Sequence, residues 1–254
     1  EVNSIFYRQS NTATATGSGI IISDDGYILT NNHIVDTSSS SSSSNGYNSY
    51  YSVSESNKVT VTLYGDSTEY EATIVGTDSQ TDLAVIKIDK TGLTPAELGD
   101  SDKVQVGEFA MAIGNPLGLD TSVTCGVISA TNREITDSDN KTYTLIQTDA
   151  AINSGNSGGA LVNADGKVIG LNTLKISSEG VEGMGFAIPI NSTIDIYQQL
   201  IEYNKVKRPY IGISGIDLDE KTASANKLVQ GIYVKSIDEF SAAEKAGIKI
   251  GDVI

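Results

Sequence analysis

Gly155-Asn156-Ser157-Gly158-Gly159 joins two apolar segments of a 254-residue chain and offers one serine to an open turn. Glycine on both sides of the serine lets the backbone adopt positive φ and leaves amide N–H groups free to converge on one point. A serine hydroxyl is a poor nucleophile unless a base removes its proton. The chain has one histidine, His33, so we expect His33 to serve Ser157 if that serine is catalytic.

The order of these residues along the chain separates two hydrolase classes. The same five residues fit G-x-S-x-G, the nucleophile elbow of α/β-hydrolases, in which the order is Ser, then Asp or Glu, then His. Here the histidine lies far upstream of Ser157, so the elbow and an esterase of that type are disfavoured. The order His, Asp, Ser of chymotrypsin-type proteases remains. Taken singly, Ser157 also fits a plain glycine-rich hairpin and His33 a buried core position, so the functional interpretation rests on both together.

Several aspartates lie between the histidine and the serine, and one of them must orient the imidazole. Asp82 opens the apolar run LAVIKI, which can hold its carboxylate away from water. Asp36 is close to His33 in sequence, and Asp149 borders apolar sequence near Ser157, where it better suits a wall of the site. We therefore select Asp82, with Asp149 second. The backbone N–H groups of Gly155 and Ser157 should form the oxyanion hole, because fixed donors stabilise the charge that develops during acyl transfer.

Composition excludes several other classes of function. The net charge is −15 and the pI about 4.3, so nucleic acids and anionic membrane surfaces should be repelled. The single cysteine, Cys125, allows no disulfide within the chain, and no apolar run is long enough to span a membrane. With one histidine and one cysteine, and no nucleotide-binding signature, we expect neither a metal site nor a cofactor.

Short β-branched runs separated by Gly, Asp and Asn turns predict an all-β protein with two similar sets of strands. We place the first set at about residues 17–90 and the second at about 105–190, as a duplicated barrel. A helical period follows over 191–204, capped by Asn191 or Ser192. Residues 208–254 form a separate short unit, in which Ser241 and Gly247 should cap a helix over 242–246.

Three motifs in register resemble the HtrA (DegP/DegS-like) family of trypsin-fold serine proteases. They are TNNHIV from residue 30, TDLAVIKI from residue 81 and GNSGGALVN from residue 155, and GFAIP follows them from residue 185. The resemblance implies two six-stranded antiparallel β-barrels over residues 1–207, with the active site between them. It also implies a catalytic triad of His33, Asp82 and Ser157, which agrees with the selection made from the residues.

Residues 208–254 resemble the first part of the PDZ domain of that family. Tyr210-Ile211-Gly212-Ile213 matches its carboxylate-binding loop, whose amides would hold the C-terminus of a peptide. The alternative is that these four residues are simply an apolar strand. The resemblance implies that the remainder of the PDZ fold is absent from this sequence.

The resemblance also addresses specificity and activation. Ala151 stands where trypsin-like enzymes that cleave after Lys or Arg carry an acid, and Ile152 and Ile176 should line a small apolar substrate pocket. Cleavage after small or medium aliphatic residues is expected. Asn156 replaces the aspartate that binds a new N-terminal amine in digestive zymogens, so cleavage of a zymogen is not the expected switch. The polar loops 132–142 and 174–185 are candidates for ordering during activation.

The expected function is a serine endopeptidase that degrades unfolded or damaged proteins in extracytoplasmic quality control under stress. Family membership implies a bacterial cell envelope location, a membrane anchor in an N-terminal segment outside this sequence, and a homotrimer to which Phe6 and Tyr7 contribute. The alternative is a chaperone or peptide-binding protein whose PDZ unit recruits C-termini, with latent or no proteolysis.

Overall fold

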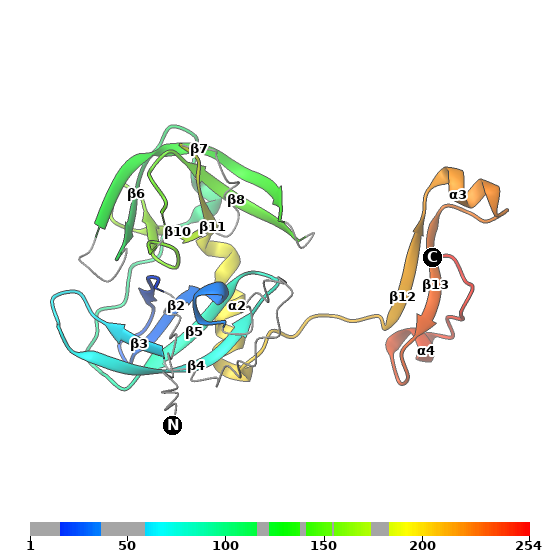
Figure 1. Cartoon of the computed structure of the whole chain (residues 1–254), viewed down its shortest axis with the longest axis horizontal. Coiled ribbons are helices and arrows are strands. Elements are labelled where there is room, and N and C mark those ends of the chain that lie inside the picture. The colour runs from blue at the N-terminus through cyan, green and yellow to red at the C-terminus, as the bar shows by residue number, and fades with distance from the viewer. Residues whose placement is uncertain (1–15, 37–58, 116–121, 138–140, 154, 174–182) are drawn as a thin grey trace, which may run out of the picture. The chain divides into compact units, whose positions relative to one another are not determined.

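The computed structural model describes residues 16–36, 59–115, 122–137, 141–153, 155–173 and 183–254. The backbone divides into two compact units, Glu1–Val206 and Lys207–Ile254, which are described separately below. The first unit carries two antiparallel β-sheets and the helix α2 (Figure 1).

The first sheet has five strands in the order β1-β2-β5-β4-β3. Its central strand β5 is almost continuously apolar because it is buried on both faces. We expected a closed six-stranded barrel here, and the described residues instead form an open half-barrel in which β1 and β3 are the edges. The strands are β1 (Ile20–Ile21), β2 (Tyr27–Asn31), β3 (Val59–Thr62), β4 (Glu69–Asp78) and β5 (Leu83–Ile88).

The second sheet is a closed six-stranded barrel in the order β10-β11-β8-β7-β6-β9, as expected from the resemblance. Small and branched side chains such as Ala110, Ile128 and Leu161 fill one cluster of its core. The strands are β6 (Phe109–Gly114), β7 (Ser122–Thr136), β8 (Thr142–Thr148), β9 (Ala160–Val162), β10 (Val168–Thr173) and β11 (Gly185–Pro189).

Strand β7 is longer than its apolar sequence predicts. It continues to Thr136 through polar residues that we assigned to a loop over 132–142. The pairing with β8 shifts register twice between Ile128 and Arg133, and Asn132 has a φ of 55°. These irregularities break the period-2 pattern, so the end of the strand is not readable as a strand from sequence. Of the second expected loop, residues 174–182 lie outside the described residues, and Gly185 begins β11.

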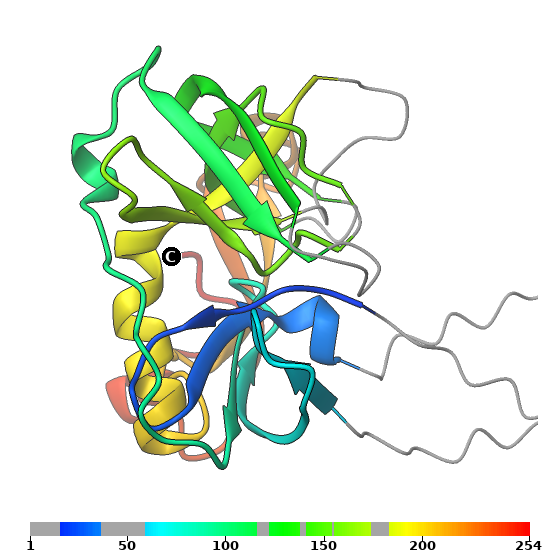
Figure 2. The same cartoon turned by 90° about the vertical axis from the view of Figure 1, so that its left-hand side faces the viewer.

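A shared core and one helix hold the two sheets together. Leu29 and Leu83 of the first sheet belong to the same buried cluster as Leu145 and Leu171 of the barrel, and Leu200 of α2 joins them. The helix α2 (Ile190–Tyr203) runs beside strands of both sheets (Figure 2). The segment between the sheets contains a short 3-10 helix, η1 (Ser101–Lys103).

The start of α2 differs from our expectation. The helix begins one residue earlier than predicted, and Pro189 is its N-cap without a side-chain cap. The Asn191 side chain instead donates to Asp100 Oδ1 at 2.8 Å and accepts from the Ser101 N–H at 3.3 Å. Asn191 therefore fastens the helix to η1 rather than capping it.

The second unit contains a two-stranded antiparallel sheet of β12 (Ile213–Leu218) and β13 (Gly231–Ile237), and two short helices. Helix α4 (Ala242–Ala246) has the predicted bounds, with Ser241 as N-cap and Gly247, at φ 81°, as C-cap. Helix α3 (Glu220–Ala225) was not predicted.

Among the described residues, no helix is long and apolar enough to cross a membrane.

Candidate active site

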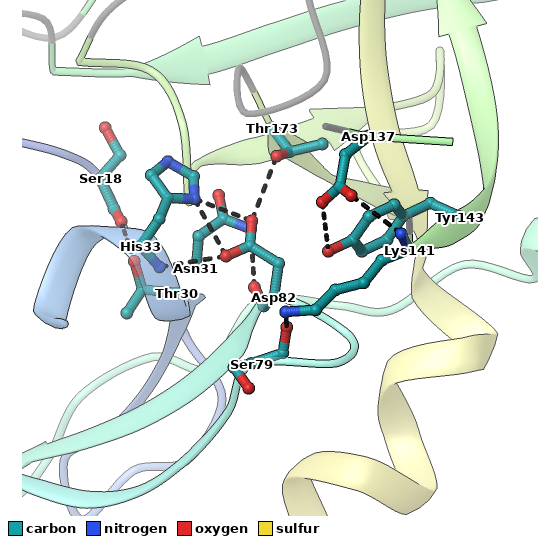
Figure 3. A network of polar contacts seen from close by, with 10 residues as sticks. All are labelled: Ser18, Thr30, Asn31, His33, Ser79, Asp82, Asp137, Lys141, Tyr143 and Thr173. Atoms are coloured by element: carbon teal, nitrogen blue, oxygen red, sulfur yellow. Dashed lines mark hydrogen bonds and ion pairs between the residues drawn. The ribbon is translucent and has the colours of Figure 1, made fainter. Parts of the chain in front are cut away.

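His33 lies in α1 (Asn32–Val35), a single helical turn that follows β2 directly. Its Nδ1 atom is 2.8 Å from Asp82 Oδ2 and 3.0 Å from Asp82 Oδ1 (Figure 3). The Asp82 side chain is 1% exposed, whereas that of His33 is 28% exposed. When Nδ1–H donates to this buried carboxylate, the lone pair of the neutral ring is on Nε2, the atom a general base uses.

The turn between β4 and β5 presents Asp82 in an uncommon backbone conformation. Asp82 has a φ of 57°, a left-handed value that few non-glycine residues adopt. Its carbonyl accepts from the Asn32 N–H at 3.0 Å and from Asn31 Nδ2 at 3.1 Å. The His33 N–H donates to its carboxylate at 3.0 Å. The backbone of α1 therefore wraps around Asp82 and fixes both the main chain and the side chain.

Two further side chains reach this turn from the barrel. Thr173, at the end of β10, places its hydroxyl 3.3 Å from Asp82 Oδ2. The Lys141 ammonium, just before β8, donates to the Ser79 carbonyl at 3.1 Å, in the turn that leads to Asp82 (Figure 3). Sequence reasoning missed both residues, because their role arises from the packing of β10 and β8 against the first sheet and leaves no local signal.

Ser157 lies in the segment between the barrel strands β8 and β9, and the start of the first sheet binds its backbone. Its carbonyl accepts from the Ser18 N–H at 2.8 Å, and the Ser18 carbonyl accepts from the Thr30 hydroxyl at 2.7 Å. Thr30 lies in β2, three residues before His33. We expected an open turn here, but Ser157 is only 2% exposed, and the Ser18 backbone, which leads into β1, lies against it.

The two glycines that flank the serine have the positive φ that the sequence predicts, 103° at Gly155 and 80° at Gly158. A Cβ atom on Gly158 would lie 2.3 Å from the Ser18 carbonyl oxygen and 2.4 Å from the Thr30 hydroxyl. Glycine is therefore required both for its backbone conformation and for the close approach of the two lobes. The Gly158 N–H donates to the Asn172 carbonyl at 2.9 Å. The oxyanion hole formed by the N–H groups of Gly155 and Ser157 stays a prediction.

The other candidate acids have different partners. Asp149 Oδ1 accepts from the Val127 N–H at 2.7 Å, which ties the segment after β8 to β7. The Asp36 N–H donates to the Asn32 carbonyl and ends α1. Of the three aspartates, Asp82 is the one in contact with the His33 ring.

Of the two isoleucines assigned to the substrate pocket, only Ile152 lies within the described residues. Ile152 is 8% exposed and belongs to the barrel core cluster, with its Cγ1 atom 2.5 Å from where a Cβ on Gly185 would stand. Ile176 lies outside the described residues, as do Phe6, Tyr7 and the serine run 38–44. Ala151 is exposed, and its carbonyl accepts from the Thr124 hydroxyl at 2.9 Å.

In the second unit, Tyr210, Ile211 and Gly212 precede β12, and Ile213 is its first residue. The Ile211 carbonyl accepts from the Ala243 N–H at 2.8 Å, and the Gly212 carbonyl accepts from the Asp238 N–H at 3.0 Å. The segment is thus a loop bound to the start of α4, with only Ile213 in the strand. Within the described part of the chain, no group of three or more His, Cys, Asp or Glu residues could hold a metal ion.

Comparison with known proteins agrees with this geometry. The family model of the trypsin-like peptidase domain matches residues 17–171. The periplasmic serine endoprotease DegP of Escherichia coli K12 is 41% identical over 251 residues, which cover 97% of this chain and 49% of that protein. The serine protease Do-like HtrB of Bacillus subtilis is 45% identical over 255 residues, covering 93% of this chain and 52% of that protein.

Solved structures similar to this chain are also proteases. The HtrA-type protease AlgW with a decapeptide is 40% identical with a TM-score of 0.74, covering 94% of this chain and 68% of that one. The serine endoprotease from Yersinia pestis is 38% identical with a TM-score of 0.69, covering 96% of this chain and 74% of that one.

The chain therefore belongs to the trypsin-like peptidases, the serine protease class in which a histidine and a serine from two packed β-lobes work together. Within that class it is a member of the HtrA-type serine proteases. It spans about half the length of the curated relatives it matches.

Proposed function

We propose that this chain is a serine endopeptidase in which His33, Asp82 and Ser157 form the catalytic triad. The observation that carries the proposal is the contact between the His33 ring and the buried Asp82 carboxylate, which Thr173 and the backbone of α1 hold in place. This arrangement favours the imidazole tautomer that can accept a proton at Nε2. It also stabilises the imidazolium that forms when the proton is taken.

The reaction follows from these roles. His33 takes the hydroxyl proton as Ser157 Oγ attacks the carbonyl carbon of the substrate, and the backbone N–H groups of Gly155 and Ser157 stabilise the oxyanion. The imidazolium then gives its proton to the leaving amine, which leaves an acyl-enzyme. Water, deprotonated by His33, hydrolyses the ester and restores Ser157.

We further propose that unfolded or damaged proteins are the substrates and that cleavage follows small or medium aliphatic residues. Ser157 is 2% exposed, so an extended, unfolded segment is the form of substrate that reaches its hydroxyl most readily. Ala151 offers no negative charge to a basic side chain, and the residue that follows it, Ile152, is apolar. Ile176 is proposed as the second pocket residue from the family resemblance.

Location and partners are proposed from the relatives. Several relatives are named periplasmic proteases, which supports an extracytoplasmic location for this chain. We further propose that Tyr210, Ile211, Gly212 and Ile213 bind peptides as part of a PDZ domain. We also propose a homotrimer that involves Phe6 and Tyr7, a role in stress-related quality control and an N-terminal anchor in the bacterial cell envelope.

Digestion of unfolded casein tests the proposed activity and specificity together. The chain should produce peptides whose cleaved bonds follow Val, Ala, Leu or similar residues, and Ser157→Ala should produce none. Cuts mainly after Lys, Arg or Asp would refute the pocket assignment. Intact casein with the unmodified chain would instead favour the alternative, a chaperone or peptide-binding protein with latent or no proteolysis.

A further inference from the structure

The carboxamide of Asn156 closes the backbone segment that precedes the nucleophile. Its Oδ1 atom accepts from the Asn153 N–H at 3.0 Å, and its Nδ2 atom donates to the Ala151 carbonyl at 3.1 Å. The Asn156 main-chain N–H donates to the Asn153 carbonyl at 3.1 Å. One side chain therefore binds both a donor and an acceptor of its own loop, and each of these partners is a neutral backbone group.

Packing leaves this side chain little freedom to make other contacts. Asn156 is 4% exposed, and a Cβ on Gly114 would lie 2.4 Å from the Asn156 Cβ. The Ala151 carbonyl also accepts from the Thr124 hydroxyl at 2.9 Å. Two neutral donors, from Asn156 and Thr124, thus converge on one carbonyl. The buried Asn156 carboxamide is costly to replace, because losing it leaves its hydrogen-bond partners without one of their bonds.

Asn156 stands between the two residues whose N–H groups are proposed to stabilise the oxyanion, Gly155 and Ser157. The peptide plane that follows Asn156 carries the Ser157 N–H, and the side-chain bonds of Asn156 to Ala151 and Asn153 close the backbone loop that carries the Gly155 N–H. We infer that Asn156 is a positioning residue, whose carboxamide holds these N–H groups in the arrangement that acyl transfer requires. The loop is then assembled by a neutral contact within itself and needs no cation from elsewhere to balance a buried charge. This inference rests on the proposed function.

Asn156→Asp tests the inference because it keeps the shape and the acceptor and removes only the donor. An ionised carboxylate would place an oxygen against the Ala151 carbonyl, where two acceptors repel each other. Burial and this repulsion raise the pKa of the introduced carboxyl above its usual range. The protonated carboxyl regains an O–H that can donate to Ala151, so lowering the pH should restore the contact.

The measurement is the rate at which a fluorophosphonate labels Ser157, expressed as the ratio of variant to unmodified chain at each pH. The ratio cancels every pH effect that the two chains share. At about pH 8 the ratio for Asn156→Asp should be about one tenth or lower. We expect only part of the loss in rate that follows when an oxyanion donor is removed altogether. Between about pH 8 and about pH 5 the ratio should rise as the carboxyl becomes protonated.

Asn163→Asp is the matched control. Among the described residues, the Asn163 side chain bonds through its Oδ1 atom alone, which accepts from the N–H groups of Asp165 and Lys167 at 3.1 and 3.0 Å. A carboxylate serves there equally well, so this variant adds the same charge and should give a ratio near one at every pH. Thr124→Val removes the other donor to the Ala151 carbonyl and should slow labelling about threefold, with no dependence of the ratio on pH.

The possible outcomes separate this inference from the proposed function. A ratio for Asn156→Asp that stays near one, or that is low at every pH in a chain that still folds, would overturn the positioning role. If that variant does not fold, unchanged labelling in Thr124→Val overturns it instead. Failure of the unmodified chain to be labelled would overturn the proposed function, and the inference with it.

Discussion

At the scale of single residues, the site depends on backbone conformations that only a few side chains tolerate. Asp82 adopts a left-handed φ of 57°, at a cost that the hydrogen bonds from Asn31, Asn32 and His33 offset. The strained turn places the buried carboxylate within hydrogen-bond distance of His33 Nδ1. A turn relaxed to ordinary φ would aim that carboxylate elsewhere.

The substitution Asp82→Asn should preserve the fold and remove most of the activity. Its amide can still accept from the His33 N–H through Oδ1, but its NH₂ group then faces Nδ1 and stabilises the tautomer with the proton on Nε2. In triad enzymes the equivalent change lowers kcat by about 10⁴-fold. Asp149→Asn is the control, because Oδ1 can still accept from the Val127 N–H, and casein digestion should stay near the unmodified rate. Equal losses in both variants would contradict the choice of Asp82.

Gly158→Ala should prevent the lobes from closing on the nucleophile. The new Cβ would collide with the Ser18 carbonyl and the Thr30 hydroxyl, which are hydrogen-bonded to each other at the start of the first sheet. Gly166→Ala is a matched control, since its φ of 76° is close to the 80° of Gly158 while nothing lies within 4 Å of its Cβ. The control should cost about 1–2 kcal/mol from backbone strain alone. Fluorophosphonate labelling of Ser157 should be lost only in Gly158→Ala, and similar labelling of both variants would show that the contact is unimportant.

At the scale of elements, α2 joins the two sheets through a narrow apolar face. Leu200 is fully buried in the core cluster shared by both sheets, and Asn204 at the helix end donates to the Val75 carbonyl of β4 at 2.7 Å. Asn204 itself has a φ of 59° and its N–H closes on the Leu200 carbonyl. The helix thus fixes the position of the first sheet relative to the barrel, and the proposed pairing of His33 with Ser157 depends on that position.

Leu200→Ala should lower the free energy of unfolding by about 2–5 kcal/mol, the range for deleting a buried leucine side chain. Gln198, on the exposed side of the same helix, provides the control, and Gln198→Ala should change stability by less than about 0.5 kcal/mol. Urea unfolding followed by circular dichroism measures both. Comparable stabilities for the two variants would mean that α2 does not hold the sheets together.

Most elements were predictable because their hydrophobic period is local, as in the apolar β5 and the helix α2. The open arrangement of the described strands of the first sheet and the bulged end of β7 were not, because pairing of edge strands and register shifts depend on partners far away in sequence. The helix α3 was also missed. Asp82 could be chosen from a local signal, its place at the start of the apolar β5, and its carboxylate contacts the His33 ring. Thr173 and the loop contact of Asn156 left no such local signal and went unnoticed.

At the scale of the whole molecule, acidity sets how stability responds to pH. The net charge is −15, yet some carboxylates are held by cations, among them Asp66. The Lys90 ammonium at 2.9 Å, followed by Thr68 and the Tyr70 hydroxyl, holds the pKa of Asp66 far below its usual value. The folded state therefore binds fewer protons than the unfolded state in acid. This contribution to stability is present above the ordinary carboxyl pKa and is lost as the pH falls toward the folded value.

Asp66→Asn should make the decline of melting temperature between about pH 5 and about pH 2 shallower than in the unmodified chain, because the group that takes up a proton on unfolding is gone. At neutral pH the variant should melt at a lower temperature, since the contacts with Lys90 and Tyr70 lose the charge of their acceptor. If the melting temperatures of the two chains fall equally steeply across this pH range, Asp66 is not among the groups that make the fold acid-sensitive.

The central claim is that His33 activates Ser157 across the two lobes, and labelling by a fluorophosphonate tests it most directly. Mass spectrometry of the labelled chain should place the adduct on Ser157, and the adduct should be absent from His33→Ala, with circular dichroism showing the same fold as the unmodified chain. An adduct on another residue, or labelling of Ser157 at an undiminished rate in His33→Ala, would contradict the claim.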